Sequence, residues 1–151
     1  MSTPGLLTRL HKCFTDISGA RILLTGGTGF VGKWMLQTAK IAQANSATKI
    51  EIVVPTRQLS ADHVQTAIAI SCPNVSRVEG DFLKDHLDLG KIDMIIHAAT
   101  PASAQLNAEN PAEMLLINVE AMESVLRYSA FNNAHTPAIA LPTIMIHDHE
   151  V

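Results

Sequence analysis

The sequence predicts an α/β fold in which a doubly wound parallel sheet lies between two layers of helices. Three observations predict it. An apolar run at residues 22–24 ends in a glycine-rich turn, and a helical pattern follows from residue 30. Apolar runs then alternate with amphipathic segments, which is typical of parallel strands joined by right-handed crossovers. The chain is 47% hydrophobic with few aromatic residues, which suits strands buried on both faces.

Each element follows from a local pattern. Residues 5–16 form an amphipathic segment before the first strand, and residues 30–44 form a helix after the glycines. The apolar face of that second helix is expected to comprise Val31, Met35, Leu36, Ala39 and Ala42. Further strands are predicted at residues 49–55, 75–79 and 91–98, with a helix from Ser60 to about residue 70 between the first two.

The last predicted helix begins at Asn110-Pro111-Ala112-Glu113. Asn110 caps the helix, Pro111 occupies the first helical position, and Glu113 can reach back to the amide of the cap residue. It runs to about residue 131, with Tyr128 on its packing face. The predicted strand order is 3-2-1-4, and residues 138–146 could add an improvised fifth strand at the edge, where Pro142 is tolerated. The domain organisation expected is an N-terminal extension at 1–18, a nucleotide-binding domain at 19–134 and an atypical tail at 135–151.

The glycine turn carries the first functional signal. Gly26, Gly29 and Gly32 are spaced G-x-x-G-x-x-G between a predicted strand and a predicted helix. Gly26 permits the sharp turn, Gly29 permits close approach of a pyrophosphate, and Gly32 permits tight helix packing. The helix start offers free N–H groups to an anion. A nucleoside-triphosphate loop is excluded because Trp34 follows Lys33 where a metal-binding hydroxyl is required.

The bulk properties exclude several function classes. The formal net charge of −3 argues against a nucleic-acid partner. No apolar run reaches the length of a membrane span, and the N-terminus lacks the apolar core of a signal peptide. Cys13 and Cys72 are read as two reduced thiols. A cytoplasmic protein without a membrane partner is therefore expected.

Residues after the second and third strands are candidates for holding the adenosine half of a dinucleotide. No carboxylate follows the second strand before Asp62, whereas Arg57 stands where a 2′-phosphate would be read. NAD or NADP is therefore expected as the cofactor, with a lean to NADP. Asp81 can accept from the adenine amino group, and Phe82 is expected near the ring; the alternative is an ordinary Asp turn.

The fourth strand ends in small residues. Ala98, Ala99 and Thr100 permit the backbone to approach the central riboses of the cofactor. His97, which precedes them, is interpreted as a packed strand residue without a functional role.

Four stretches together resemble the extended short-chain dehydrogenase/reductase family: ILLTGGTGFVGKWML, VEGDFLKD, IDMIIHAATPAS and NPAEMLLINVEAMESVL. The closest branch is the NAD-dependent epimerase/dehydratases that act on nucleotide sugars, so the fold implied is Rossmann-like. By this resemblance Phe30 and Val31 line the pyrophosphate beside Gly26 and Gly29, and Asn118 matches an Asn usual in the helix after the fourth strand. The resemblance also implies a nucleotide-sugar substrate in the full-length family, and a homodimer is possible.

The chain departs from that resemblance in its catalytic residues. Family members carry a Tyr-x-x-x-Lys pair, but the one tyrosine here, Tyr128, is followed four residues later by Asn132. No catalytic residue is therefore assigned, and a truncated product that is inactive alone is expected. The alternatives are a non-catalytic NAD(P)-binding module or partner subunit, or a truncation without function. His147 and His149 could ligate a metal, but a frayed tail is preferred, so no metal site is predicted.

Overall fold

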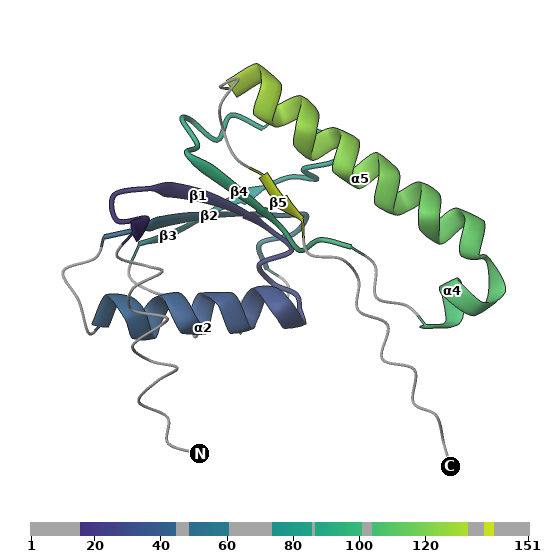
Figure 1. Cartoon of the computed structure of the whole chain (residues 1–151), viewed down its shortest axis with the longest axis horizontal. Coiled ribbons are helices and arrows are strands. Elements are labelled where there is room, and N and C mark those ends of the chain that lie inside the picture. The colour runs from purple at the N-terminus through teal and green to yellow at the C-terminus, as the bar shows by residue number, and fades with distance from the viewer. Residues whose placement is uncertain are drawn as a thin grey trace, which may run out of the picture.

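A computed structural model of the chain describes residues 16–44, 49–60, 74–85, 87–100, 104–132 and 138–140. Five strands form a single sheet, and three helices accompany it in the described part of the chain (Figure 1). The elements are β1 (Arg21–Thr25), α2 (Phe30–Ala44), β2 (Glu51–Thr56), β3 (Val75–Glu79), β4 (Met94–His97), α4 (Ala104–Glu109), α5 (Pro111–Asn132) and β5 (Ala138–Ala140).

The strand order is β3-β2-β1-β4-β5, and every pairing is parallel. This confirms the predicted order 3-2-1-4, and β5 confirms that a short additional strand pairs beside the fourth. The order reverses at β1: the chain proceeds outwards to β2 and β3 and then returns to β4 on the other side. The carboxyl ends of β1 and β4 are therefore neighbours at the switch point, where open α/β sheets bind their ligands.

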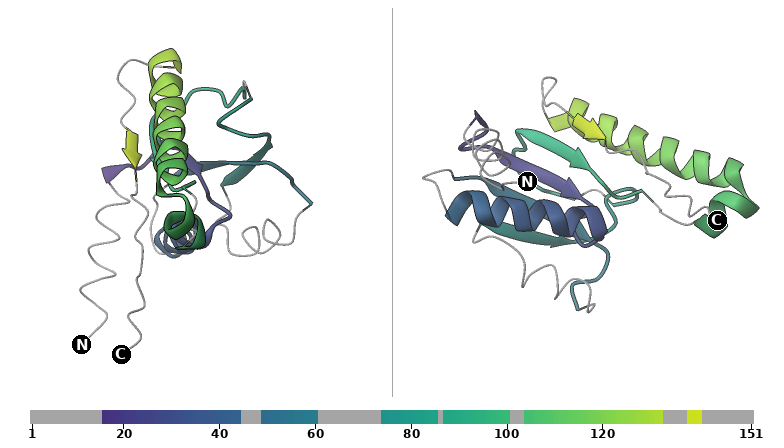
Figure 2. Two further views of the ribbon diagram at one scale, coloured as in Figure 1. Left: turned by 90° about the vertical axis from the view of Figure 1, so that its right-hand side faces the viewer. Right: turned by 60° about the horizontal axis from the view of Figure 1, so that its bottom comes forward.

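Two separate apolar cores lie on the two faces of the sheet. On one face, Leu24 packs with Leu36 and Ala39 of α2. On the opposite face, Leu23 packs with Ile95 and with Val125 of α5. Successive strand side chains point to opposite faces, so β1 contributes to both cores. The result is three layers, with α2 below the sheet and α5 above it (Figures 1 and 2).

The helix that covers the upper face begins at the predicted cap. The Glu113 N–H donates to Asn110 Oδ1 at 3.2 Å, and Asn110 Nδ2 donates to Glu113 Oε2 at 2.8 Å. The glutamate thus reaches the side chain of the cap residue. The helix continues through Tyr128, which is half-buried and packs on Phe82 with 5.5 Å between ring centroids and the ring planes tilted by 57°. The expectation that Tyr128 packs in the core is confirmed.

Three local features differ from the sequence-based expectation. The fourth strand begins at Met94 because Asp93, just before it, uses its carboxylate to accept the Arg21 N–H at 2.9 Å. The short helix α4 was not predicted. Val31 points outward and is 45% exposed, since it belongs to the first turn of α2 rather than to its packed face.

Other predicted features lie outside the described residues: the N-terminal amphipathic segment, the helix that starts near Ser60, and Pro142. Within the described ranges, no helix combines the length and the apolar character that crossing a membrane would require.

Candidate functional site

The turn between β1 and α2 is compressed against the end of β4. Gly26 has φ 71°, a conformation that residues with a side chain rarely adopt. A Cβ on Gly26 would lie 2.7 Å from the Ala99 amide nitrogen and closer still to the Ala98 carbonyl. A Cβ on Gly32 would overlap the backbone of Gly26 and Gly27. Both positions therefore require glycine, as predicted, and the turn is folded tightly between two strand ends.

The turn leads directly into the helix start. The Gly29 N–H donates to the Gly26 carbonyl at 2.9 Å, and the Lys33 N–H donates to the Gly29 carbonyl at 3.0 Å. The amides of Phe30, Val31 and Gly32 precede this first bond of the helical ladder, and among the described residues they have no acceptor, as is usual at a helix N-terminus. These donors and the positive end of the helix dipole are suited to binding an anion.

Gly29 differs from the other two glycines of the motif. Its φ is not positive, and a Cβ there would meet only the Gly26 carbonyl oxygen, at 3.2 Å. The fold could therefore accommodate a methyl group with a small adjustment. The space beside Gly29 opens to solvent next to Phe30, whose side chain is 80% exposed. Internal packing therefore constrains Gly29 less than it constrains Gly26 and Gly32.

The end of β4 borders the same place. The Ala98 N–H donates to the Thr25 carbonyl at 3.1 Å, which extends the β1–β4 pairing by one bond beyond the last residue of β4. Ala98, Ala99 and Thr100 are all half-buried. The structure therefore brings the small residues predicted to border the cofactor against the glycine turn.

A buried polar pair lies directly beneath these two segments. Thr25 and His97 are each 1% exposed, and Thr25 Oγ1 lies 2.6 Å from His97 Nδ1. Burial lowers the pKa of His97, which keeps the imidazole neutral near pH 7. His97 Nε2 is also buried, and it has no hydrogen-bond partner among the described residues. Sequence reasoning gave His97 no role, because the register that pairs it with Thr25 is not visible in the sequence.

The residues proposed for the adenosine half are placed at the ends of β2 and β3. Arg57 directly follows β2, and its side chain is exposed. β3 continues into Gly80, whose N–H donates to the Thr56 carbonyl at 2.8 Å, and then into Asp81. Arg57 and Asp81 therefore follow neighbouring strands at the same edge of the sheet, although no described contact joins them.

Asp81 and Phe82 have internal partners. Asp81 Oδ1 accepts the Leu83 N–H at 3.0 Å, and the Asp81 N–H donates to Asp85 Oδ2 at 2.5 Å. These bonds form the ordinary Asp turn that the sequence offered as an alternative to adenine binding. They use Oδ1 and the backbone N–H of Asp81, and neither uses Oδ2 as an acceptor. Phe82 packs on Tyr128 in the core beneath α5.

Asn118 lies in α5 and is half-buried. Its side-chain amide donates to the Met114 carbonyl at 2.9 Å within the same helix. The described contacts do not join Asn118 to the glycine turn, and its role in the site remains a prediction. No group of three or more metal-ligating side chains occurs among the described residues, and His147 and His149 lie outside them.

Comparison with known proteins identifies the family. The sequence profile of the NAD-dependent epimerase/dehydratase family matches residues 22–139. The chain belongs to this family. None of the curated proteins compared with it matches.

Solved structures of epimerases and dehydratases share the fold of this family member. An epimerase from Methanothermobacter thermautotrophicus is 24% identical, with a TM-score of 0.65 over 89% of this chain and 38% of that one. UDP-glucose 4-epimerase from Bifidobacterium longum, solved with NAD⁺ and UDP, is 20% identical, with a TM-score of 0.58 over 75% of this chain and 34% of that one. The dTDP-glucose 4,6-dehydratase DesIV from Streptomyces venezuelae, solved with NAD bound, is 20% identical, with a TM-score of 0.58 over 74% of this chain and 36% of that one.

These matches cover between 34% and 38% of the three solved chains, so the present chain spans little more than a third of their length. At these identities the likeness establishes the Rossmann-like fold. The cofactor in the family's name fits the glycine turn, because the turn offers unpaired amides beside a space that a Cβ on Gly29 would enter.

Proposed function

We propose that this chain is the NAD(P)-binding portion of a nucleotide-sugar epimerase or dehydratase, that it acts in the cytoplasm, and that alone it binds the dinucleotide without turning over a sugar. The observation that carries the proposal is the glycine turn. The amides of Phe30, Val31 and Gly32 have no acceptor among the described residues, and they follow the exposed Gly29 at the switch point of the sheet. Membership of the NAD-dependent family makes a dinucleotide the anion that this site would take.

Several of the predicted site residues have a role in this proposal. The amides after Gly29 bind the pyrophosphate, and Ala98 and Ala99 let the riboses lie close to the backbone. Arg57 and Asp81 bind the adenosine end. The bound nicotinamide would supply a hydride acceptor and donor.

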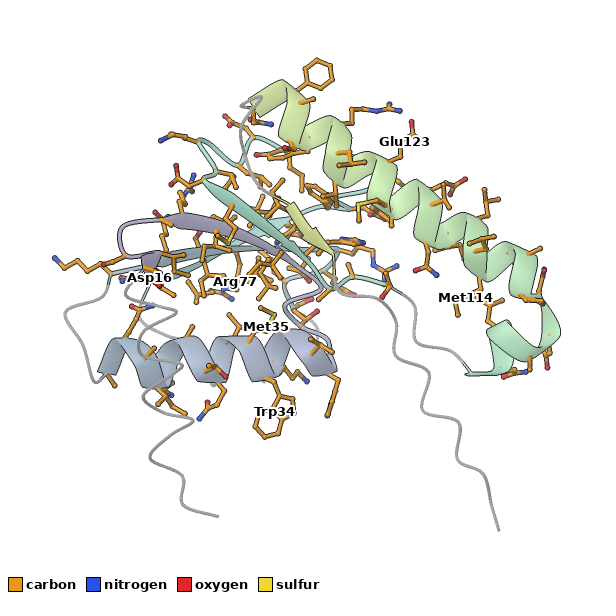
Figure 3. The ribbon with its side chains drawn as sticks, viewed as in Figure 1. Asp16, Trp34, Met35, Arg77, Met114 and Glu123 are labelled. Carbon is orange, nitrogen blue, oxygen red and sulfur yellow. The ribbon has the colours of Figure 1, made fainter. Side chains whose placement is uncertain are left out.

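The direct test is calorimetric titration with NAD⁺, NADH, NADP⁺ and NADPH. Trp34 provides a second signal, because it is the one tryptophan of the chain and lies one helical turn beyond Gly29. Its side chain points away from the sheet into solvent (Figure 3). We expect saturable binding at micromolar concentrations together with quenching of Trp34 fluorescence. Absence of binding to all four dinucleotides would contradict the proposal.

A pair of glycine variants separates binding from folding. In Gly29→Ala the new methyl group would occupy the phosphate space, and we expect affinity to fall at least about tenfold, the equivalent of 1.4 kcal/mol. Stability should change little, since the Cβ meets a single oxygen at 3.2 Å. The control is Gly19→Ala at the opposite end of β1, where φ is 88° and no atom lies within 4 Å. That variant should lose stability and keep its affinity.

The choice between NAD and NADP rests on Arg57. The described residues after β2, from Arg57 to Ser60, contain no carboxylate to bind a ribose 2′-hydroxyl, and the exposed Arg57 suits a 2′-phosphate. We therefore favour NADP. Arg57→Gln should weaken NADP⁺ binding and leave NAD⁺ binding within about twofold of wild type, because a lost charge-assisted bond matters only where the phosphate exists.

The absence of turnover follows from the state of Tyr128. A catalytic tyrosine base needs a lowered pKa, whereas burial raises the pKa of Tyr128. Its hydroxyl is buried without a partner among the described residues, and Asn132 stands where lysine would be needed. No sugar epimerisation or dehydration by the isolated chain is therefore expected. A partner subunit that carries the Tyr-x-x-x-Lys pair would instead make this chain a binding module, and restored turnover on mixing would identify it.

A homodimer is consistent with the surface of α5. Five large apolar side chains of this helix are exposed: Leu115, Leu116, Val119, Leu126 and Phe131. Large apolar side chains exposed in such number on one helix are typical of interaction surfaces. Light scattering coupled to size exclusion should give twice the monomer mass, and Leu116→Glu combined with Leu126→Glu should give the monomer.

A further inference from the structure

The buried Thr25–His97 pair lies where the glycine turn meets the end of β4. Thr25 is the last residue of β1 and His97 is the last residue of β4, and the two are direct partners in the parallel register. Their side chains are joined by a 2.6 Å contact between Oγ1 and Nδ1. The glycine turn begins at the residue after Thr25, and the segment that borders the cofactor begins at the residue after His97.

The pair is costly for the fold. Both side chains are 1% exposed, and they lie on the sheet face that carries Leu23 and Ile95, under α5. Taking a hydroxyl and an imidazole out of water is unfavourable unless every polar atom finds a partner. His97 Nε2 has none among the described residues. Two apolar side chains of similar volume would serve the packing at least as well, because replacing both partners of a buried polar contact is near neutral.

The pair also joins two strand ends whose separation sets the position of the glycine turn. The Ala98 N–H donates to the Thr25 carbonyl, and Gly26 is packed so closely on Ala98 and Ala99 that no Cβ fits. A change in the separation of the strand ends would therefore move the turn relative to Ala98. A hydrogen bond fixes that separation and its direction, whereas apolar packing tolerates sliding.

We propose that Thr25 and His97 are positioning residues: their side-chain hydrogen bond holds the end of β1 against the end of β4, and so sets the geometry with which the glycine turn binds a dinucleotide. The inference rests on the proposed function. It concerns the two side chains beneath the site, which touch the ligand only through the backbone segments that they hold.

The test is the double variant Thr25→Val with His97→Leu, which removes both polar groups and leaves no unpaired atom. Urea unfolding should show stability equal to wild type or higher. Dinucleotide affinity, measured by calorimetry on the full chain, should nevertheless fall about tenfold, which is the loss expected when one hydrogen bond no longer supports the bound geometry. A merely structural role would leave affinity unchanged whenever stability is kept.

Conservative variants supply the rescue. Thr25→Ser keeps the hydroxyl and should bind within about twofold of wild type, whereas the nearly isosteric Thr25→Val should bind as weakly as the double variant, because the same bond is lost. The matched control is Ser76→Ala in β3, which also removes a buried hydroxyl. Unlike that of Thr25, this hydroxyl has no partner among the described residues, and β3 lies away from the turn. This variant should keep wild-type affinity.

The outcomes are distinct. If wild type binds and the double variant binds equally well, the positioning role is wrong and the proposed function stands. Equal affinities of Thr25→Ser and Thr25→Val would overturn it in the same way, even if the double variant fails to fold. If wild type binds no dinucleotide, the proposed function fails, and the positioning role fails with it.

Discussion

The tightness of the glycine turn can be measured by placing a single methyl group on Gly26. Two terms add in Gly26→Ala. Holding an alanine at φ 71° costs about 1 kcal/mol. The Cβ would also overlap the backbone of Ala98 and Ala99, and an overpacking clash of this kind costs about 2 kcal/mol. The free energy of unfolding should therefore fall by about 3 kcal/mol, which is a large share of the stability of a domain this size.

Gly19→Ala isolates the first of these terms. Its φ of 88° imposes a similar backbone cost, but open space surrounds the position. With an unfolding slope of about 2 kcal/mol per molar urea, the midpoint should fall by about 1.5 M for Gly26→Ala and by about 0.5 M for Gly19→Ala. Circular dichroism and Trp34 fluorescence would report the two curves. Equal midpoints for the two variants would refute the close packing of the turn against the end of β4.

Three further predictions concern the layers around the site. Val125 is fully buried and Leu126 is 56% exposed, so Val125→Ala should cost about 2 kcal/mol in urea unfolding and Leu126→Ala less than about 0.5 kcal/mol. Removing the helix cap in Asn110→Ala should lower the free energy of unfolding by about 1 kcal/mol, and an unchanged midpoint would contradict the capping contact. Burial lowers the folded-state pKa of His97, so below an unfolded pKa near 6.5 only the unfolded chain gains that proton. Stability should then fall with decreasing pH by up to about 1.4 kcal/mol per unit until the folded pKa is reached, and His97→Leu should lack this component.

The strand order and the glycine turn could be predicted because each rests on local pattern. The apolar run before Gly26, the spacing of Gly26, Gly29 and Gly32, and the cap at Asn110 each describe a few consecutive residues. The parallel topology then follows from alternation of strands and helices. Even β5 could be predicted, because a short apolar segment follows the last long helix.

The features that sequence reasoning missed depend on contacts between distant residues. The start of β4 is set by Asp93, which turns its carboxylate to the Arg21 N–H 72 positions away. The Thr25–His97 pair spans the same separation and exists only because the two strands align in one register. The contact between Phe82 and Tyr128 in the core beneath α5 likewise joins residues far apart in the chain. Tertiary packing of this kind leaves no periodic trace in the chain.

The central claim is that unpaired amides at the start of α2 bind the diphosphate of a nicotinamide dinucleotide. Amide ¹H–¹⁵N spectra of the labelled chain, recorded during titration with NADP⁺, test it residue by residue. The signals of Gly29, Phe30, Val31 and Gly32 should shift most. Those of Gly19 and Gly90, which precede β1 and β4 at the opposite end of the sheet, should stay in place. Saturable binding with the amides of Phe30, Val31 and Gly32 unmoved would contradict the claim.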